Sequence, residues 1–332
     1  MGKVEIKWLE PFAQSWTGRV EQGRAPHAVL LSGPVGVGKR AAAIWMASGR
    51  LGIGAQTALP LHPAECPEHA DLRWIAPLED KQTISVDQIR DLVAVLNLTS
   101  YTGDGKVAII APANSMTDSA ANSLLKTLEE PPGDTLIILI ADRAGRLPAT
   151  IFSRCQRIEI SPPDEGEALA WLDRLQPGAA WAEALGLAGN APLAALGALQ
   201  QLDTHATMSR DFSDVASGRI SALDVAAKWV KLDTAFVLDW LVRQVQYVIS
   251  AVFTGRNSRV AAAIDDSVLK RMDRRNLFCY LDTINRLRGQ PAGSYNVHLT
   301  LERLLIDWAE SLKNCGQDPI RDNMWQLLVE RP

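Results

Sequence analysis

Gly33-Pro34-Val35-Gly36-Val37-Gly38-Lys39-Arg40 is the stretch that decides how this chain folds. It follows an apolar run at 28–31 and precedes a helix-favouring run at 41–47. A strand, a glycine-rich turn and a helix in that order form a phosphate-binding loop, whose backbone N–H groups point inward and whose lysine adds positive charge. Gly33, Gly36, Gly38 and Lys39 are therefore the candidate phosphate-binding residues.

One position of this loop departs from the working pattern. A complete loop has Gly, four residues, Gly, Lys and then Ser or Thr, whose hydroxyl ligates Mg²⁺. The last position here is Arg40, which has no acceptor to offer a cation. The cradle for phosphate is present and its metal ligand is missing.

Composition limits the class of protein. The 332 residues predict two or three domains, and the start of the chain does not resemble a secretory signal. A formal net charge of −4 and an isoelectric point of about 5.8 argue against a protein that wraps nucleic acid unaided. Four widely spaced cysteines predict no disulfide framework and a cytoplasmic location. Because no apolar run approaches ~20 residues, we expect no membrane span.

The first 160 residues alternate between helical and strand patterns. Ser85 and Gln88 have the spacing of a capping box at the start of one helix. Strands that alternate with helices predict a parallel sheet with helices on both faces, from residue 1 to about 160. We expect helices at 5–24, 41–47, 85–97 and 117–130, and strands at 28–31, 74–77, 106–112, 135–141 and 156–160.

Helical patterns alone follow residue 160. Ser161 at the N-cap and Pro162 at the first helical position predict the start of a small helical domain, 161–205. A polar stretch, 200–211, is the predicted linker to an all-α domain, 206–332. Apolar residues at helical spacing predict two core helices in that domain, one with Phe236, Trp240, Leu241, Val245, Val248 and Val252, the other with Leu301, Leu304, Leu305, Trp308 and Leu312.

A loop at 49–71 holds His62, Cys66 and His69. Their spacing loosely resembles a metal site, but a structural zinc site requires four ligands and Asp71 is a poor fourth candidate. We expect a surface loop with one free thiol and no metal ion.

The strand at 106–112 is the place for the acids of a working nucleotide site. A phosphate-loop ATPase puts an Asp for Mg²⁺ and an acid for the attacking water near the end of such a strand. This strand runs into Ala111 and Pro112, and the next acid, Asp118, is already in the following helix. Since the loop lacks its hydroxyl and the strand lacks its acids, we expect no intrinsic ATP hydrolysis.

Three segments carry a resemblance to a known family: Arg24-Ala25-Pro26-His27-Ala28-Val29-Leu30-Leu31-Ser32-Gly33, then Asn122-Ser123-Leu124-Leu125-Lys126-Thr127-Leu128-Glu129-Glu130-Pro131-Pro132, then Ser153-Arg154-Cys155. They resemble the bacterial clamp-loader ATPase family, strongly over 24–160, more softly over 161–200, and by length and class alone beyond. The resemblance implies an AAA+ P-loop α/β domain, 1–160, a small helical lid, 161–205, and a helical collar domain, 206–332. The degenerate loop makes the chain similar to the family's non-hydrolysing members.

The resemblance also implies a role for Arg154, with Ser153 and Cys155 as the flanking motif positions. In this family the arginine reaches across a subunit interface to the γ-phosphate of ATP on a neighbouring motor subunit. A guanidinium binds phosphate oxygens bidentately, and an arginine supplied in trans raises the rate by about 10³–10⁵. The alternative is a loop arginine in a local salt bridge.

Other positions depart from the family's nucleotide-sensing pattern. A sensor threonine is expected where this chain has Ala141-Asp142-Arg143, and a sensor arginine is expected in 189–192, where none occurs. Only Cys66 stands where the motor subunits carry a four-cysteine zinc module. We therefore expect no cofactor in this chain, with ATP bound by its partners.

The leading hypothesis is a rigid, non-catalytic stator. The resemblance implies a hetero-oligomeric ring with gamma/tau-type motor subunits and a delta subunit, within the DNA polymerase III holoenzyme. That ring loads the sliding clamp on primer-template DNA. Two alternatives stay open. An active ATPase needs Asp118 or Glu129 as a compensating metal ligand, and a DNA-binding module acting alone conflicts with the acidic balance.

Overall fold

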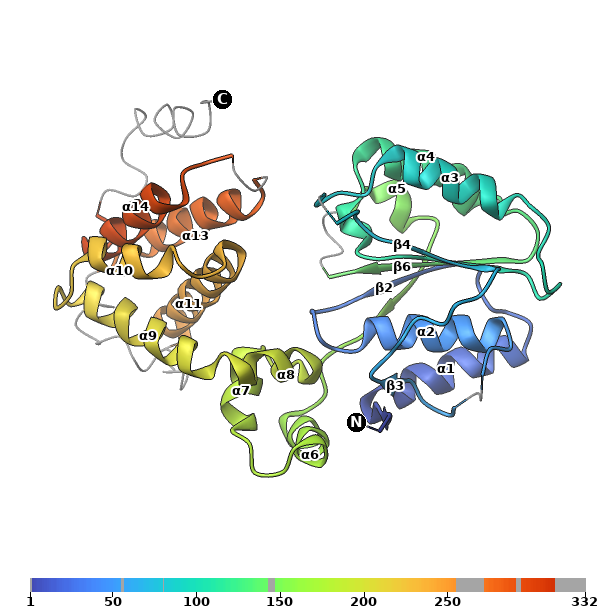
Figure 1. The fold of residues 1–332 in the computed structure, drawn as a ribbon, viewed down its shortest axis with the longest axis horizontal. Coiled ribbons are helices and arrows are strands. Elements are labelled where there is room, and N and C mark those ends of the chain that lie inside the picture. The colour runs from blue at the N-terminus through green and yellow to red at the C-terminus, as the bar shows by residue number, and fades with distance from the viewer. Residues whose placement is uncertain are drawn as a thin grey trace. The chain divides into compact units, whose positions relative to one another are not determined.

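The computed structural model describes residues 2–54, 57–79, 81–142, 147–254, 272–290 and 294–313. The chain divides into two compact units, 1–200 and 201–332. The first contains a sheet and the helices around it, and the second is helical (Figure 1). The helices of the predicted lid belong to the first unit.

The first unit is built on a five-stranded parallel sheet in the order β4-β5-β6-β2-β7. Its strands are β2 (Ala28–Ser32), β4 (Leu72–Ile75), β5 (Lys106–Ile110), β6 (Thr135–Ala141) and β7 (Gln156–Glu159). β5 and β6 are buried throughout, as their continuous apolar runs predict for strands covered on both faces. β2 lies between β6 and β7, so its carboxyl end is flanked on both sides. The predicted parallel sheet is confirmed.

Helices cover both faces of this sheet (Figure 1). One face carries α3 (Val86–Leu96), α4 (Asp118–Glu129) and α5 (Ala149–Phe152), and the other carries α1 (Glu10–Glu21) and α2 (Lys39–Arg50). The apolar side chains of α3 and α4 form one core with those of β2, β5 and β6. The capping box that begins α3 is confirmed, because Ser85 Oγ accepts from the Gln88 N–H at 3.3 Å and the Gln88 side chain accepts from the Ser85 N–H at 3.0 Å.

The start of the chain differs from the prediction of one helix over 5–24. Val4–Glu5 is a short strand, β1, which pairs antiparallel with β3 (Leu61–His62). A 3₁₀ turn, η1 (Lys7–Leu9), follows, and α1 begins at Glu10. Pro11 in the first turn suits a helix start, and the strand depends on a partner far along the chain that a local pattern cannot show.

Three helices complete the first unit: α6 (Glu165–Leu175), α7 (Trp181–Leu187) and α8 (Pro192–Gln200). The predicted helix start at Ser161 was wrong. Asp164 is the N-cap and accepts from the Glu167 N–H at 2.8 Å. A proline disfavours helical geometry in the residue before it, so the pair Pro162 and Pro163 delays the helix.

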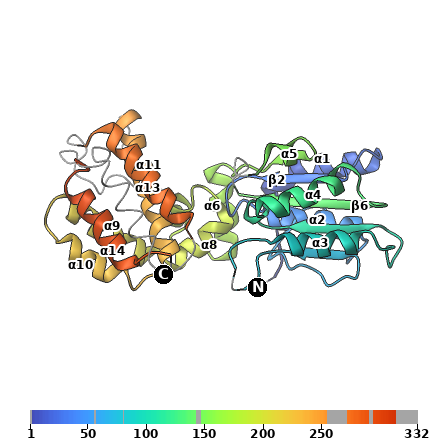
Figure 2. The ribbon, with the colours of Figure 1, turned by 90° about the horizontal axis from the view of Figure 1, so that it is seen from above.

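The second unit contains α9 (Leu202–Ala216), α10 (Ala222–Trp229), α11 (Thr234–Thr254), α13 (Arg274–Arg288) and α14 (Val297–Ala309), which lie side by side in Figures 1 and 2. The predicted linker at 200–211 was wrong, because α9 occupies it. Its polar residues hid a buried face at helical spacing that includes Met208, Phe212 and Val215.

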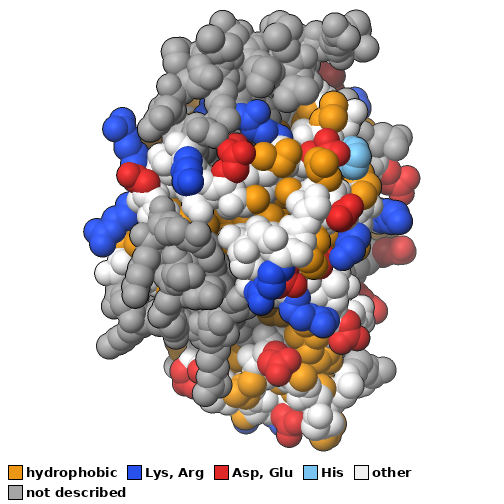
Figure 3. All heavy atoms as spheres, turned by 90° about the vertical axis from the view of Figure 1, so that its left-hand side faces the viewer, with side chains coloured by type: hydrophobic (Ala, Val, Ile, Leu, Met, Phe, Trp, Pro, Cys, Tyr) orange, Lys and Arg blue, Asp and Glu red, His pale blue; other side chains and the backbone are white. Residues whose placement is uncertain are grey.

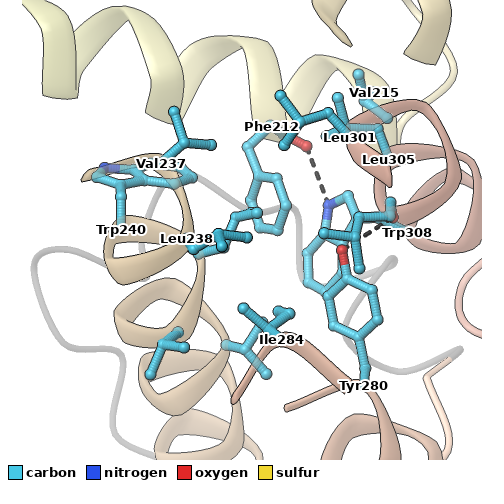
Figure 4. Packing of buried hydrophobic residues seen from close by; sticks show 14 of the residues in the cluster. Phe212, Val215, Val237, Leu238, Trp240, Tyr280, Ile284, Leu301, Leu305 and Trp308 are labelled. Atoms are coloured by element: carbon cyan, nitrogen blue, oxygen red, sulfur yellow. Dashed lines mark hydrogen bonds between the residues drawn. The ribbon is translucent and has the colours of Figure 1, made fainter. Parts of the chain in front are cut away.

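Stacked aromatic rings form the centre of this unit (Figure 4). Phe212 of α9 stacks on Trp308 of α14 with ring centroids 4.1 Å apart. Trp308 Nε1 donates to the Phe212 carbonyl at 3.1 Å, and the Tyr280 hydroxyl donates to the Leu304 carbonyl at 2.9 Å. Both predicted apolar stripes face this core, with Phe236 and Val252 half-buried at its margin. The prediction of core helices is confirmed.

The outer face of the second unit mixes hydrophobic and charged side chains (Figure 3). Within the described residues, Thr234–Phe253 of α11 is long and apolar enough to cross a membrane by length and composition, although half of it is buried inside the unit. α7 and α8 pass the same test only together and are bent by 108°. A core helix such as α11 meets this criterion without a bilayer.

Candidate functional site

The glycine-rich loop joins β2 to α2 at the carboxyl edge of the sheet. Gly33, Gly36 and Gly38 have φ angles of 140°, 85° and 102°, a region that favours glycine. A Cβ at Gly33 would lie 2.1 Å from the Ile160 carbonyl oxygen, and one at Gly36 would lie 2.4 Å from the Ala194 nitrogen. Close packing within the protein therefore requires glycine at positions 33 and 36.

The Lys39 ammonium is turned into its own loop. Nζ donates to the Gly33 carbonyl at 2.6 Å and to the Pro34 carbonyl at 2.5 Å, and it lies 2.8 Å from Asp142 Oδ1. The side chain is only 5% exposed. Because an ammonium has three N–H donors, these three acceptors account for all of them. Lys39 is thus an internal tie between the start of α2 and the end of β6.

Asp142 reaches Lys39 because of the sheet order. It follows β6, and the parallel register places Ala141 opposite Ser32 at the end of β2. Its own N–H donates to Asn114 Oδ1 at 3.3 Å, which holds this stretch in place. The sequence marked Asp142 as an altered sensor position but did not predict this contact, since the pairing of β2 with β6 was needed to find it. Arg143 of the same stretch lies outside the described residues.

The first turn of α8 packs on the middle of the loop. The Leu193 N–H donates to the Gly36 carbonyl at 3.0 Å, and Ala194 lies against Gly36. The N-terminal N–H groups of a helix have no partner within the helix, so the loop carbonyl satisfies one of them. The loop is fixed to the α8 region by this contact.

Arg40, which replaces the Mg²⁺-binding hydroxyl, contacts another part of the unit. Its guanidinium lies 4.3 Å from the ring centroid of Trp74, within the range of a cation–π contact. Its Nε donates to the Ala64 carbonyl at 3.5 Å. Arg40 therefore links the start of α2 to β4 and to the loop that precedes it.

The three residues of the loosely metal-like pattern have separate environments. The His62 ring packs edge-on against Trp171, with centroids 5.8 Å apart. His69 Nδ1 accepts from the Asp71 N–H at 3.1 Å, and burial raises the pKa of the half-buried Cys66 thiol. Across the described part of the chain, no group of three or more His, Cys, Asp or Glu residues is placed to hold a metal ion.

Arg154 follows α5 and binds the end of α4. Its Nε donates to Glu129 Oε1 at 2.7 Å, and Nη2 donates to the same oxygen. On the other side, Nη1 donates to the Thr150 carbonyl at 3.0 Å and to Ser153 Oγ at 3.1 Å. The side chain remains 28% exposed. The local salt bridge that was the alternative for Arg154 is present in this chain.

Cys155 belongs to the interior, unlike its two neighbours in the triplet. It is buried, and burial raises the pKa of its thiol to about 11, so at neutral pH it is a packing residue without thiolate character. An open surface hollow of about 980 Å³ lies between the glycine-rich loop and β7, and its lining includes Gly33, Asp142, Cys155 and Arg157. β2 and β7 are parallel neighbours, and the loop follows the carboxyl end of β2 whereas the triplet precedes the amino end of β7. The loop and the triplet therefore belong to opposite ends of these two strands.

The fold and the loop define a P-loop α/β protein whose loop has lost its Mg²⁺ ligand. A family model described as "DNA polymerase III, delta subunit" matches residues 8–164. DNA polymerase III subunit delta' of Pseudomonas aeruginosa is 30% identical over 91% of this chain and 97% of that protein. DNA polymerase III subunit tau of Bacillus subtilis is 33% identical over 42% of this chain and 25% of that protein. A gamma subunit-related protein from Thermotoga maritima is 19% identical, with a TM-score of 0.46 over 93% of this chain and 99% of that one.

The chain belongs to the DNA polymerase III subunit delta' family. The similarity to the Pseudomonas relative runs through both compact units, so the family includes the helical unit as well as the sheet.

Proposed function

We propose that this chain is a non-catalytic clamp-loader subunit whose own loop binds no nucleotide. The observation that carries the proposal is the engagement of Lys39, whose three donors are taken by Gly33, Pro34 and Asp142. The lysine that would bind phosphate is already paired with a carboxylate, that of Asp142, inside the protein. The contact of Gly36 with α8 supports a stator role, because it ties the loop to its neighbouring helix.

The alternative of an active ATPase has less support. It requires a carboxylate for Mg²⁺ beside the loop, and β5 ends without one. Glu129, one candidate, is bound to Arg154, and Asp118, the other, is an exposed residue in the first turn of α4. Asp142 does lie beside the loop, but it is paired with Lys39 rather than free for a metal ion.

The second part of the proposal is that Arg154 acts on a neighbour. It is a partly exposed guanidinium, held in position by the backbone and hydroxyl of its own turn. Such a group suits the γ-phosphate of ATP on a gamma/tau-type motor subunit. We place the chain in a cytoplasmic hetero-oligomeric ring with motor and delta subunits, as part of the polymerase holoenzyme, which loads the sliding clamp on primer-template DNA.

Two measurements test this function. The isolated chain is expected to bind no Mg²⁺-ATP by calorimetry and to show no turnover above background. In a reconstituted ring, Arg154→Ala is expected to lower DNA-stimulated ATP hydrolysis at the adjoining site by about 10³-fold or more. Arginines supplied in trans contribute a factor of about this size in other phosphoryl-transfer enzymes. Arg157→Ala, which removes an exposed arginine three residues away on β7, is the control and is expected to have little effect. Turnover by the isolated chain, or an unchanged rate with Arg154→Ala, would refute the proposal.

A further inference from the structure

The Arg154 guanidinium has two edges with different partners. The Nη1 side is bound by the Thr150 carbonyl and the Ser153 hydroxyl, both from its own turn. The Nε and Nη2 side is bound by a single carboxylate oxygen, Oε1 of Glu129, from a separate helix. Four of the five N–H donors of the guanidinium are therefore in use.

This arrangement leaves no free pair of donors for an incoming phosphate. A bidentate contact uses two N–H groups that point the same way, and the fifth donor stands alone. The Nη1 pair is held by groups that are part of the α5 turn. The Nε and Nη2 edge is the one that can be cleared, because its partner is a flexible side chain that is 48% exposed.

We propose that Glu129 occupies the phosphate-binding edge of Arg154 in the free chain and is exchanged for the phosphate when the chain docks on its neighbour. This inference rests on the proposed trans role of Arg154. Glu129 presents an anionic oxygen to the same two donors that a phosphate oxygen would use. The two anions exclude each other, since each needs the same N–H groups on Nε and Nη2. Thr150 and Ser153 keep the guanidinium in position while the partner at the other edge changes.

The exchange predicts a cost that ATP must overcome. An ion pair as exposed as Arg154–Glu129 weakens competing binding by up to about five-fold. Removing the negative charge of Glu129 is therefore expected to strengthen ATP-dependent docking. It leaves the chemistry unchanged, because Arg154 ends in the same contact with the phosphate.

The test uses the reconstituted ring with Glu129→Gln in this chain. The ATP concentration for half-maximal hydrolysis is expected to fall, by up to about five-fold, while the maximal rate stays at the wild-type value. Glu130→Gln is the matched control, because it removes the same charge from the next residue, whose exposed side chain does not bind Arg154, and it is expected to match the wild type. The unfolding midpoint of each isolated variant shows that its fold is intact.

The outcomes distinguish a failure of this exchange from a failure of the proposed trans role of Arg154. If Arg154→Ala leaves hydrolysis unchanged, the trans arginine itself fails. If Arg154→Ala lowers the rate and Glu129→Gln matches the wild type, the arginine role stands and the exchange is refuted. A maximal rate that falls with Glu129→Gln also refutes the exchange, because Glu129 would then hold Arg154 in its working position. In the double variant, Glu129→Gln is expected to have no further effect on Arg154→Ala.

Discussion

Lys39 Nζ lies 2.8 Å from Asp142 Oδ1, where β2 and β6 end side by side. In a phosphate-binding loop, the lysine is the residue that binds the ligand. Here it is paired with a carboxylate that directly follows the neighbouring strand, β6. The Lys39 ammonium thus has an anionic partner within the protein. The loop retains its glycines because Ile160 and Ala194 pack against them, which is a requirement of folding that persists without a nucleotide.

Asp142→Ala is expected to destabilise the first unit. The buried Lys39 ammonium would keep its two carbonyl partners and lose its counter-ion, at a cost of about 1–3 kcal/mol in the free energy of unfolding. Urea unfolding of the isolated chain measures it. Asp134→Ala is the control, because its pair with Arg50 is exposed and contributes less than about 1 kcal/mol. Equal losses in the two variants would contradict the structural role of Asp142.

Gly36→Ala is expected to separate the first turn of α8 from the loop. A Cβ at this position would overlap Ala194, and the residue also has a φ of 85°. Hydrogen exchange of the 192–200 amides is expected to rise while that of the sheet stays low. Gly23→Ala is the matched control, with a φ of 64° and no atom within 4 Å of its Cβ. It is expected to cost about 1 kcal/mol from backbone strain alone and to leave α8 protected. Equal protection of α8 in both variants would show that the contact with Gly36 does not hold this helix.

The elements that could be predicted are those whose signal is local. β6 was predicted with its observed bounds, 135–141, because the continuous apolar run 136–141 is typical of a strand buried on both faces. The capping box at Ser85 was equally clear. α9 was missed because its polar residues outnumber the apolar face formed by Met208, Phe212 and Val215. β1 was missed because two residues gain their strand geometry only from Leu61 and His62.

The candidate site also contains features that the sequence alone shows and features that depend on the fold. The loss of the Mg²⁺ ligand at Arg40 and of acids after β5 is a property of residue type, which the sequence shows. The contacts of Asp142 with Lys39 and of Glu129 with Arg154 depend on strand order and on how α4 meets α5. Each joins residues that are distant in the chain, so no local pattern contains them.

Trp308→Ala is expected to cost about 3–5 kcal/mol in the stability of the second unit. The indole stacks on Phe212 and Tyr280 and is fully buried, so its removal leaves a cavity in the aromatic core. Trp308→Phe keeps a stacked ring and loses the bond to the Phe212 carbonyl, so the expected loss is smaller. Leu223→Ala, at a half-exposed position on α10, is the control and is expected to stay within about 0.5 kcal/mol. Comparable losses for Trp308→Ala and Leu223→Ala in chemical denaturation would contradict the central place of Trp308.

The acid stability of the first unit is expected to depend on Asp71. Burial alone would raise the pKa of this carboxyl, but hydrogen bonds from the N–H groups of Tyr101 and Thr102 and from nearby hydroxyls outweigh it and lower the pKa to about 2. Since the unfolded chain has the higher ordinary pKa, Asp71 contributes stability above about pH 4 and loses it as the pH falls through about 2.

The measurement compares urea midpoints of the wild type and Asp71→Asn at pH 5, 3.5 and 2.5. Asparagine cannot titrate, and its amide group would turn donors toward the N–H groups of Tyr101 and Thr102. The variant is therefore expected to be less stable at pH 5, and the difference is expected to shrink as the pH falls. Asp87→Asn removes an exposed carboxylate in a surface pair with Arg90 and is the control. A difference between wild type and Asp71→Asn that stays constant with pH would mean that the carboxylate charge does not hold the 98–105 turn against β4.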